Sequence, residues 1–199
     1  MRATFTERLR LEPITPHHAH DLWLIHNDDE VARWYGGSKP TEEEARQRAV
    51  AMAYSWRAFG VHKWMAYDRE TGGLIGRGGP SPTPADDDWG RVNNFLPKQP
   101  WVREVRRGPR GELVHANWLE IGWALRPQFW GRGYATELGR AGLAYSFDTL
   151  GMGAVVSCTD NGNVKSLAVM ERLGMTYAGT LQDLGSGADL AVYKQLRPS

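Results

Sequence analysis

A short stretch in the second half of the chain joins a strand-like run to a helix-like run through two closely spaced glycines. The apolar run 119–125 (Leu-Glu-Ile-Gly-Trp-Ala-Leu) comes before it, and a helix-like run extends from Tyr134 to Leu150. Between them lie residues 128–136, Gln-Phe-Trp-Gly-Arg-Gly-Tyr-Ala-Thr. Pro127 has no N–H to donate to a strand ladder, so the strand ends there. The stretch therefore predicts a strand, a tight turn and the first turn of a helix.

The chemistry of such a joint favours an anion. N–H groups in the first turn of a helix have no intrahelical partner and lie at the positive end of the helix dipole. Two glycines separated by one residue allow a sharp turn and leave these N–H groups uncovered by side chains. A phosphate or pyrophosphate suits such a site best. The alternative is a glycine-rich turn without a ligand, and the loosely specified loop alone does not decide between the two.

Two common phosphate motifs do not match. A Walker loop needs Gly-Lys followed by Ser or Thr, and no such lysine is present in the loop. A dinucleotide fingerprint needs a third glycine where Thr136 stands, inside a repeating strand–helix–strand pattern. The pattern that does match is Gln-x-x-Gly-x-Gly after a strand and before a long helix.

A second motif lies further along the chain. Residues 159–166 (Thr-Asp-Asn-Gly-Asn-Val-Lys-Ser) follow the strand-like run 154–158 and lead into a helix-like run at 167–175. Asn163 is a favourable helix N-cap, and Gly174 is placed to end the helix. The second motif is therefore a strand, Asn-x-x-Ser and a short helix.

Together the two motifs resemble the GNAT superfamily of acyl-CoA-dependent N-acyltransferases, whose corresponding loop grips the pyrophosphate of coenzyme A. The first part of the chain resembles the branch of the ribosomal-protein N-terminal alanine acetyltransferases. The similar segments are Leu-x-x-Ile-Thr-Pro at 11–16, Val-Ala-Arg-Trp at 31–34 and a Trp-x-Ala…Thr-Gly-x-Leu-Ile-Gly hairpin at 64–76. The resemblance covers most of 8–78 and 118–196 but not the middle of the chain.

The resemblance implies a set of functional residues. Acetyl-CoA would be held by the strand, the loop and the second motif, that is by Trp123, Ala124, Leu125, Gln128, Trp130, Gly131, Arg132, Gly133, Tyr134, Ala135, Thr136, Asn163 and Ser166. Ser166 would also protonate the departing thiolate, because Met170 stands where many members of the family have a tyrosine. We expect Trp34, Tyr35, Trp89 and Trp101 to contact the acceptor.

Acyl transfer to an amine also needs a base, because an alkylammonium has a pKa near ~10 and only the neutral amine attacks. Glu120 lies in the strand before the loop, where related enzymes of this branch place a candidate base. Its side chain is expected to point away from those of Leu119 and Ile121. The alternative is a strand carboxylate that faces solvent or pairs with an arginine.

Residues 79–117 match no part of the family pattern. Prolines punctuate 78–84, Asp86-Asp87-Asp88 is expected to be solvated loop charge, and 102–106 with 112–115 form a candidate hairpin. A long connection in a compact domain is usually functional or disordered, and its tryptophans argue against disorder. We expect an inserted lid with Trp89, Phe95 or Trp101 lining the acceptor site. A satellite apolar cluster or a dimer contact is the equal alternative.

Composition sets the outer bounds. The 199 residues suffice for one well-buried domain, and the net charge of +1 gives no electrostatic footprint for nucleic acid or an acidic membrane. The single Cys158 cannot form an internal disulfide, and neither a membrane span nor a signal-peptide core is present, which favours the cytoplasm. His17, His18 and His20 lack the partners of a metal site, so no metal is expected. A homodimer is left open.

The predicted fold is therefore a single α/β (α+β) domain with a mixed, mostly antiparallel twisted sheet and about four helices. The predicted function is transfer of an acetyl group from acetyl-CoA to a primary amine by direct attack in a ternary complex. Two alternatives remain: a bulkier donor such as succinyl-CoA, suggested by Arg103, Arg106, Arg107 and Arg110, and a non-catalytic CoA-binding module. A peptide N-terminus, a polyamine, an antibiotic amine and an amino acid all remain open as acceptors.

Overall fold

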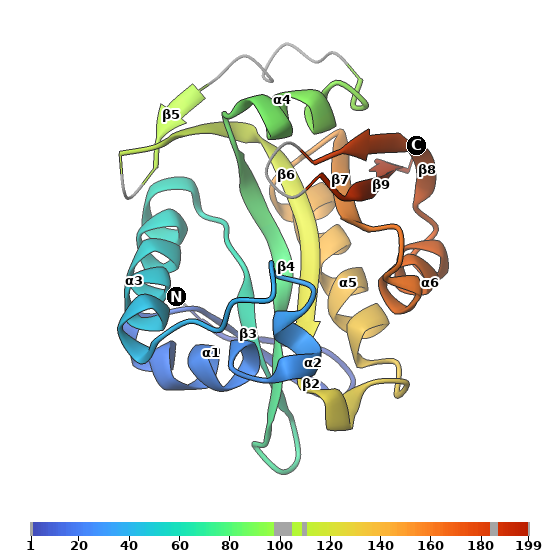
Figure 1. The fold of residues 1–199 in the computed structure, drawn as a ribbon. Helices are drawn as coiled ribbons and strands as arrows, with labels where there is room; N and C mark the ends of the chain where they lie inside the picture. The colour runs from blue at the N-terminus through green and yellow to red at the C-terminus, as the bar shows by residue number, and fades with distance from the viewer. Residues whose placement is uncertain (1, 98–104, 109–110, 184–186, 199) are drawn as a thin grey trace. The chain divides into compact units, whose positions relative to one another are not determined.

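The computed structural model describes residues 2–97, 105–108, 111–183 and 187–198, and the chain divides into two compact units (Figure 1). Unit 1 comprises residues 1–79 and 123–141, and unit 2 comprises residues 80–122 and 142–199. The prediction of a single domain with an insert stays a prediction. None of the helices in the described ranges combines the length and apolar character that a membrane span requires.

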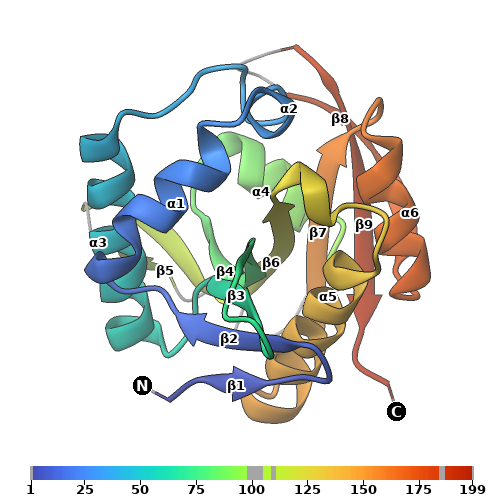
Figure 2. The ribbon, with the colours of Figure 1, turned by 90° about the horizontal axis from the view of Figure 1, so that it is seen from below.

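Unit 1 contains a group of neighbouring strands. Its strands are β1 (Thr4–Phe5), β2 (Leu9–Pro13), β3 (Trp64–Asp68), the first part of β4 (Leu74–Pro84) and the end of β6 (Leu113–Leu125), in the order β1-β2-β3-β4-β6. Of these strands, β1 to β4 pair antiparallel. The neighbouring β1 and β2 are seen along their length in Figure 2. Buried and half-buried residues alternate along β2, as in a strand with one face toward the core.

In unit 1, α2 (Asp29–Ala32) and α3 (Glu42–Phe59) begin at residues whose side chains cap them. The helices of the unit are the 3-10 turn η1 (Pro16–His18), α1 (Ala19–His26), α2, α3, η3 (Pro127–Phe129) and most of α5 (Tyr134–Ala144). At α3 the predicted capping box is present: Glu44 N donates to Thr41 Oγ1 at 3.2 Å, and Thr41 N donates to Glu44 Oε2 at 2.7 Å. Gly60 ends α3 with a positive φ of 69°.

The core of unit 1 carries two of the predicted site segments. Its buried members come from the connection after β2, from α1, α2, α3 and β3, and from the end of β6: Ile14, Leu22, Ile25, Val31, Ala49, Met65, Tyr67 and Ala124. Trp130, from the predicted phosphate loop, packs against this cluster. The loop and the strand end before it therefore rest on a closely packed base.

Unit 2 contains the remaining strands. These are the second part of β4, β5 (Val105–Arg107), most of β6, β7 (Ala154–Asp160), β8 (Thr176–Gln182) and β9 (Asp189–Leu196), in the order β4-β6-β7-β9-β8, with β5 paired to β6. The β6–β7 pair is parallel, with Glu120 opposite Val156. The β7–β9, β8–β9 and β5–β6 pairs are antiparallel. The open, mostly antiparallel sheet of the predicted fold class is confirmed.

The helices of unit 2 are α4 (Asp87–Asn93), the π-helical turn η4 (Tyr145–Thr149) and α6 (Val164–Arg172). Over the described ranges the chain forms six α-helices, two of which, α2 and α4, are short. The second apolar cluster, Val92, Leu96, Ala154, Val156 and Val192, joins α4 to β7 and β9. Gly174 follows α6 with a φ of 77°, as predicted for a helix end.

The proline-punctuated stretch forms the end of β4. The sequence instead predicted that this strand stops at Arg77. In β4, Pro80, Pro82 and Pro84 occupy every second position. The residues between them direct their main-chain N–H groups at β6, because Ala85, which continues the same alternation, donates from its N to Leu113 O. The missing N–H groups of the prolines thus lie on the other edge, where the register with β3 has already ended at Gly78. A strand tolerates proline on an unpaired edge.

The acidic run after these prolines was also wrongly predicted as solvated loop. Asp86 is the N-cap of α4, with Trp89 N donating to Asp86 Oδ1 at 2.8 Å, and Asp87 and Asp88 lie in the first turn. Carboxylates at these positions stabilise a helix through its dipole. The candidate hairpin nearby is confirmed, since Val105 pairs with His115.

A glycine in β4 permits a close approach of two strands in unit 1. A Cβ at Gly76 would collide with the carbonyl oxygen of Ala124 and would lie 2.7 Å from Leu125 Cα. We expect Gly76→Ala to lower the free energy of unfolding by about 1–3 kcal/mol, the usual cost of overpacking. In Gly90→Ala, within α4, the new Cβ meets nothing within 4 Å, and helix propensity predicts a gain of up to ~1 kcal/mol. Urea unfolding of both variants measures the difference, and equal losses would contradict the close approach.

Candidate functional site

The predicted phosphate loop has the backbone geometry of an anion site. Gly131 and Gly133 both have left-handed φ angles, 73° and 81°, and the loop from Gly131 to Gly133 is exposed. A Cβ at Gly131 would meet nothing within 4 Å, so the space above the turn is open. The turn leads directly into α5, whose first main-chain N–H groups belong to Tyr134, Ala135 and Thr136. The loop therefore fits a pyrophosphate.

The loop is held at both ends. Before the turn, Trp130 Nε1 donates to Leu125 O at 2.7 Å, which fixes the loop to the end of β6. After the turn, Arg8 Nη1 donates to Arg132 O at 2.9 Å, and the Arg8 guanidinium lies 4.5 Å from the centre of the Tyr134 ring. These contacts fix the direction of the main chain before a ligand arrives.

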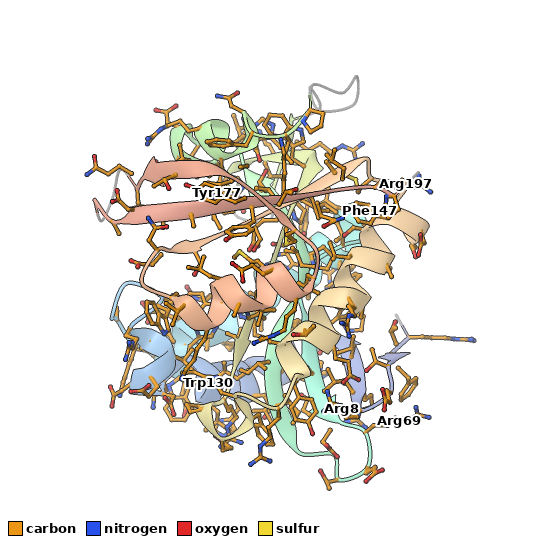
Figure 3. All side chains as sticks on the ribbon, turned by 90° about the vertical axis from the view of Figure 1, so that its right-hand side faces the viewer. Arg8, Arg69, Trp130, Phe147, Tyr177 and Arg197 are labelled. Atoms are coloured by element: carbon orange, nitrogen blue, oxygen red, sulfur yellow. The ribbon has the colours of Figure 1, made fainter. Side chains whose placement is uncertain are left out.

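Arg8 also engages a carboxylate of the helix that follows the loop. Its Nε lies 2.7 Å from Glu137 Oε2, its main-chain N donates to Glu137 Oε1 at 2.8 Å, and Thr6 Oγ1 donates to the same oxygen at 2.6 Å. Burial opposes the charged form of Glu137, but the hydrogen bonds from Thr6 and Arg8 outweigh it and lower the pKa. Sequence patterns do not reveal this pair, because its members are 129 positions apart. Figure 3 shows Arg8 beside the exposed Arg69.

Residues Trp123–Leu125 form the end of β6 in unit 1. Ala124 and Leu125 are buried, and Trp123 is half-buried. Tyr35, which is 43% exposed, donates from its hydroxyl to Trp123 O at 3.1 Å. The structure thus brings one predicted acceptor residue into contact with the predicted donor strand. Trp34 is half-buried and lies under the guanidinium of Arg33.

Beneath Tyr35 lies a buried basic pair that the sequence did not reveal. Arg77 of β4 donates from Nε to His26 Nε2 at 3.1 Å, and His26 packs edge-on against the Tyr35 ring with 4.8 Å between ring centres. Burial, followed by the charges of Arg77 and Arg48, lowers the pKa of His26 to about 2. His26 is therefore neutral at physiological pH and accepts the hydrogen bond.

In unit 2, Glu120 of β6 and the polar residues of the neighbouring strand β4 form a polar strip. Its side chain is half-buried, and Ser81 Oγ donates to Glu120 Oε2 at 3.4 Å. Further along, Asn93 Nδ2 donates to the buried Thr83 Oγ1 at 3.0 Å. The strip links β4, β6 and α4.

Among the described residues, four buried polar atoms of unit 2 have no hydrogen-bond partner, namely Asn93 Oδ1, His115 Nδ1, Trp118 Nε1 and Gln195 Oε1. The rings of His115 and Trp118 contact each other with 4.7 Å between centres, and burial lowers the pKa of His115 despite the opposing charge of Asp86. Orphaned buried polar atoms are uncommon in native structures, and an unseen polar ligand is one explanation.

The second motif also adopts the predicted local structure. Asn163 caps α6, with Ser166 N donating to Asn163 Oδ1 at 3.2 Å. Ser166 is half-buried, whereas Met170 is 1% exposed and belongs to the core. A thiolate therefore finds its candidate proton donor at Ser166 and none at Met170.

The aromatic residues of the middle segment have an identifiable packing role. Trp89 and Phe95 pack against the apolar cluster of unit 2, which corresponds to the satellite-cluster alternative. A role for Trp89 in acceptor binding stays a prediction. Trp101, Arg103 and Arg110 lie outside the described residues.

Among the described residues, no group of three His, Cys, Asp or Glu side chains could hold a metal ion. One of the three histidines near the start of the first helix has a structural role. His18 Nε2 lies 3.1 Å from Glu12 Oε2, and Thr15 N donates to His18 Nδ1 at 2.9 Å.

Comparison with known proteins identifies the family of this chain. The model of the acetyltransferase (GNAT) domain matches residues 8–176. The uncharacterized protein YkkB of Bacillus subtilis (strain 168) is 27% identical over 191 residues, which cover 96% of this chain and 93% of YkkB. An Aspergillus fumigatus protein named FsC-acetyl coenzyme A-N(2)-transacetylase is 28% identical over 177 residues, 88% of this chain and 65% of that protein.

The fold has close structural counterparts. The ribosomal-protein-S5-alanine acetyltransferase of Vibrio fischeri superposes with a TM-score of 0.70, 15% identity and coverage of 100% of this chain and 98% of that chain. At that identity the likeness concerns the fold, and the family rests on the domain match. The chain belongs to the GNAT family of acetyltransferases.

Proposed function

We propose that this acetyltransferase moves an acetyl group from acetyl-CoA to a primary amine by direct attack, with both substrates bound together. The observation that carries the proposal is the open turn at Gly131 and Gly133 that leads into the N-terminus of α5. A diphosphate matches the unpaired N–H groups of that turn in both charge and shape. The name of the Aspergillus relative, which specifies acetyl coenzyme A, supports the choice of donor.

The donor-binding roles implied by the two motifs are assigned as follows. The loop, with Gln128, Trp130, Arg132 and the first turn of α5, would hold the diphosphate. The main chain of Trp123–Leu125 would pair with the pantetheine amides and direct an N–H group at the thioester oxygen. Asn163 and Ser166 would approach the pantetheine arm and the sulfur. When it is bound, acetyl-CoA supplies the activated acetyl thioester.

Glu120 is assigned the role of general base. The neutral amine forms the new C–N bond, the C–S bond breaks, and the proton lost by the amine goes to a Glu120 carboxylate oxygen directly or through water. Ser81 Oγ, which donates to Glu120 Oε2, orients the carboxylate. Ser166 Oγ would protonate the sulfur of the leaving thiolate, and solvent restores the serine proton.

The decisive test of this function is product formation. Purified protein is mixed with acetyl-CoA and a panel of primary amines, and release of free thiol is measured together with the mass of each amine. Thiol release coupled to an acetylated amine supports the proposal. Coenzyme A binding without any transfer would favour a binding module instead.

The loop assignment predicts a charge effect at Gly131. Aspartate and asparagine both tolerate the left-handed backbone there and differ mainly in charge. We expect Gly131→Asp to weaken coenzyme A binding at least about tenfold relative to Gly131→Asn, that is by ~1.4 kcal/mol, because the carboxylate repels the diphosphate. Isothermal titration calorimetry gives both dissociation constants, and equal values would remove the diphosphate from this loop.

The clamp around the loop predicts a role for Arg8. Hydrogen bonds between charged groups contribute about 1.5–3 kcal/mol, so Arg8→Met is expected to weaken coenzyme A binding roughly tenfold or more. In Arg8→Met the carboxylate of Glu137 is left without its arginine partner. The double variant Arg8→Met/Glu137→Gln removes this charge and should recover part of the lost coenzyme A affinity. Arg69→Met is the control, because Arg69 is exposed and makes a side-chain hydrogen bond to Thr6 O outside the loop. An effect at Arg69 as large as that at Arg8 would argue against a specific clamp.

The assignment of the base predicts a separation of binding from turnover. Glu120→Gln should lower kcat by about 10²–10⁴-fold, the usual contribution of general base catalysis, and leave coenzyme A affinity unchanged. Glu171→Gln, at an exposed position in α6, should change neither quantity. Steady-state kinetics with an accepted amine measures the difference. Wild-type kcat in Glu120→Gln would exclude Glu120 as the base.

A further inference from the structure

Arg77 is a buried cation without an acidic partner. The residue is 8% exposed and lies in β4, within unit 1. Its Nε donates to His26 Nε2, and among the described residues its two terminal nitrogens make no hydrogen bond and no carboxylate forms an ion pair with it. A buried arginine is ordinarily paired, because an uncompensated charge in the interior is strongly unfavourable.

The residues around Arg77 make its charge harder to satisfy. Burial and the charges of Arg77 and Arg48 lower the pKa of His26, and burial and the charges of Lys63 and Arg77 lower the pKa of His62 to about 3. No acidic side chain raises either of these pKa values. Burial is the larger cause of both shifts, and the charge of Arg77 contributes to each of them.

This basic cluster is connected to the predicted donor strand by one aromatic side chain. The Arg77 guanidinium lies 5.1 Å from the centre of the Tyr35 ring, and the Tyr35 hydroxyl donates to Trp123 O at 3.1 Å. Tyr35 is 43% exposed. The same side chain therefore contacts solvent, the guanidinium of Arg77 and the end of β6. A ligand that contacts Tyr35 therefore comes within reach of Arg77.

We propose that Arg77 binds a carboxylate of the acceptor, so that the acceptor is a small amine that also carries a carboxylate. The planar guanidinium presents paired donors that match the two oxygens of a carboxylate. The same positive charges repel polyamines and aminoglycosides, which carry several positive charges. The site would therefore disfavour binding of these polycations and favour binding of an amino acid. This inference rests on the proposed acetyl transfer and defines its substrate class.

The first experiment compares matched acceptors with the wild-type protein. Amino acids with the amine at the α, β or γ position are tested beside their primary amides, together with spermidine and one aminoglycoside. Thiol release from acetyl-CoA gives kcat/KM for each. We expect at least one acid to exceed its amide about tenfold or more, since a charged hydrogen-bonded pair is lost in the amide. Equal values for acids and amides, or a preference for the polycations, would overturn the inference.

The second experiment identifies the residue responsible. Arg77→Gln should remove the preference for the acid by raising its KM, while kcat/KM for the amide and the dissociation constant of coenzyme A stay at their wild-type values. Arg77→Lys should keep part of the preference, because the charge remains but the planar fork is lost. Arg57→Gln, an exposed arginine of α3, is the matched control and should behave as wild type. If Arg77→Gln fails to fold, the acid-to-amide comparison in the wild type still decides the inference.

Failure of the inference and failure of the proposed function give different results. Absence of both coenzyme A binding and transfer to any amine refutes the proposed function. Transfer to amides and polyamines at the rate of the acids refutes only the anionic acceptor. If coenzyme A binds but no amine of the panel reacts, calorimetry with the same acids and amides decides. Binding that does not favour acids, or that survives in Arg77→Gln, overturns the carboxylate site.

Discussion

The unpaired main-chain N–H groups at the start of α5 are the feature on which the proposed chemistry depends. They attract a diphosphate only if nothing closer satisfies or cancels them, and Glu137 in the first turn of the same helix is a competing negative charge. The structure removes this competition by turning the carboxylate toward Thr6 and Arg8. Arg8 then uses a second nitrogen to hold the carbonyl oxygen of Arg132. One arginine thus neutralises the competing acid and fixes the turn.

Local sequence patterns sufficed wherever the structure is decided by neighbours in the chain. Thr41 and Glu44 cap α3, Asn163 caps α6, and the paired glycines give the turn before α5, all as predicted. The failures came from rules applied without tertiary context. Pro80, Pro82 and Pro84 belong to a strand because the edge they would disrupt is not paired to β3. Asp86 looked like loop charge because its helix, α4, is short and is stabilised by packing against β7 and β9.

The parts of the candidate site that the sequence could not predict are charge pairings over long distances. Arg8 and Glu137 are 129 positions apart, and His26 and Arg77 are 51 positions apart. Neither pair has a spacing that periodicity or motif analysis detects, and a single sequence offers many arginines and acids for each. What the sequence did predict are main-chain features, such as caps, turns and strand ends, because these depend on residue type within one turn or one strand.

The basic cluster at Arg77 bears on the proton that the base must remove. In a free amino acid the carboxylate stabilises the nearby ammonium and so opposes its deprotonation. Binding of that carboxylate to Arg77 would neutralise the stabilising charge, and the charge of Arg77, which after burial contributes to the lowered pKa values of His26 and His62, would oppose a second positive charge nearby. Both effects would lower the pKa of the amine and favour the neutral form that attacks. Recognition of the acceptor and its activation would then depend on the same cation.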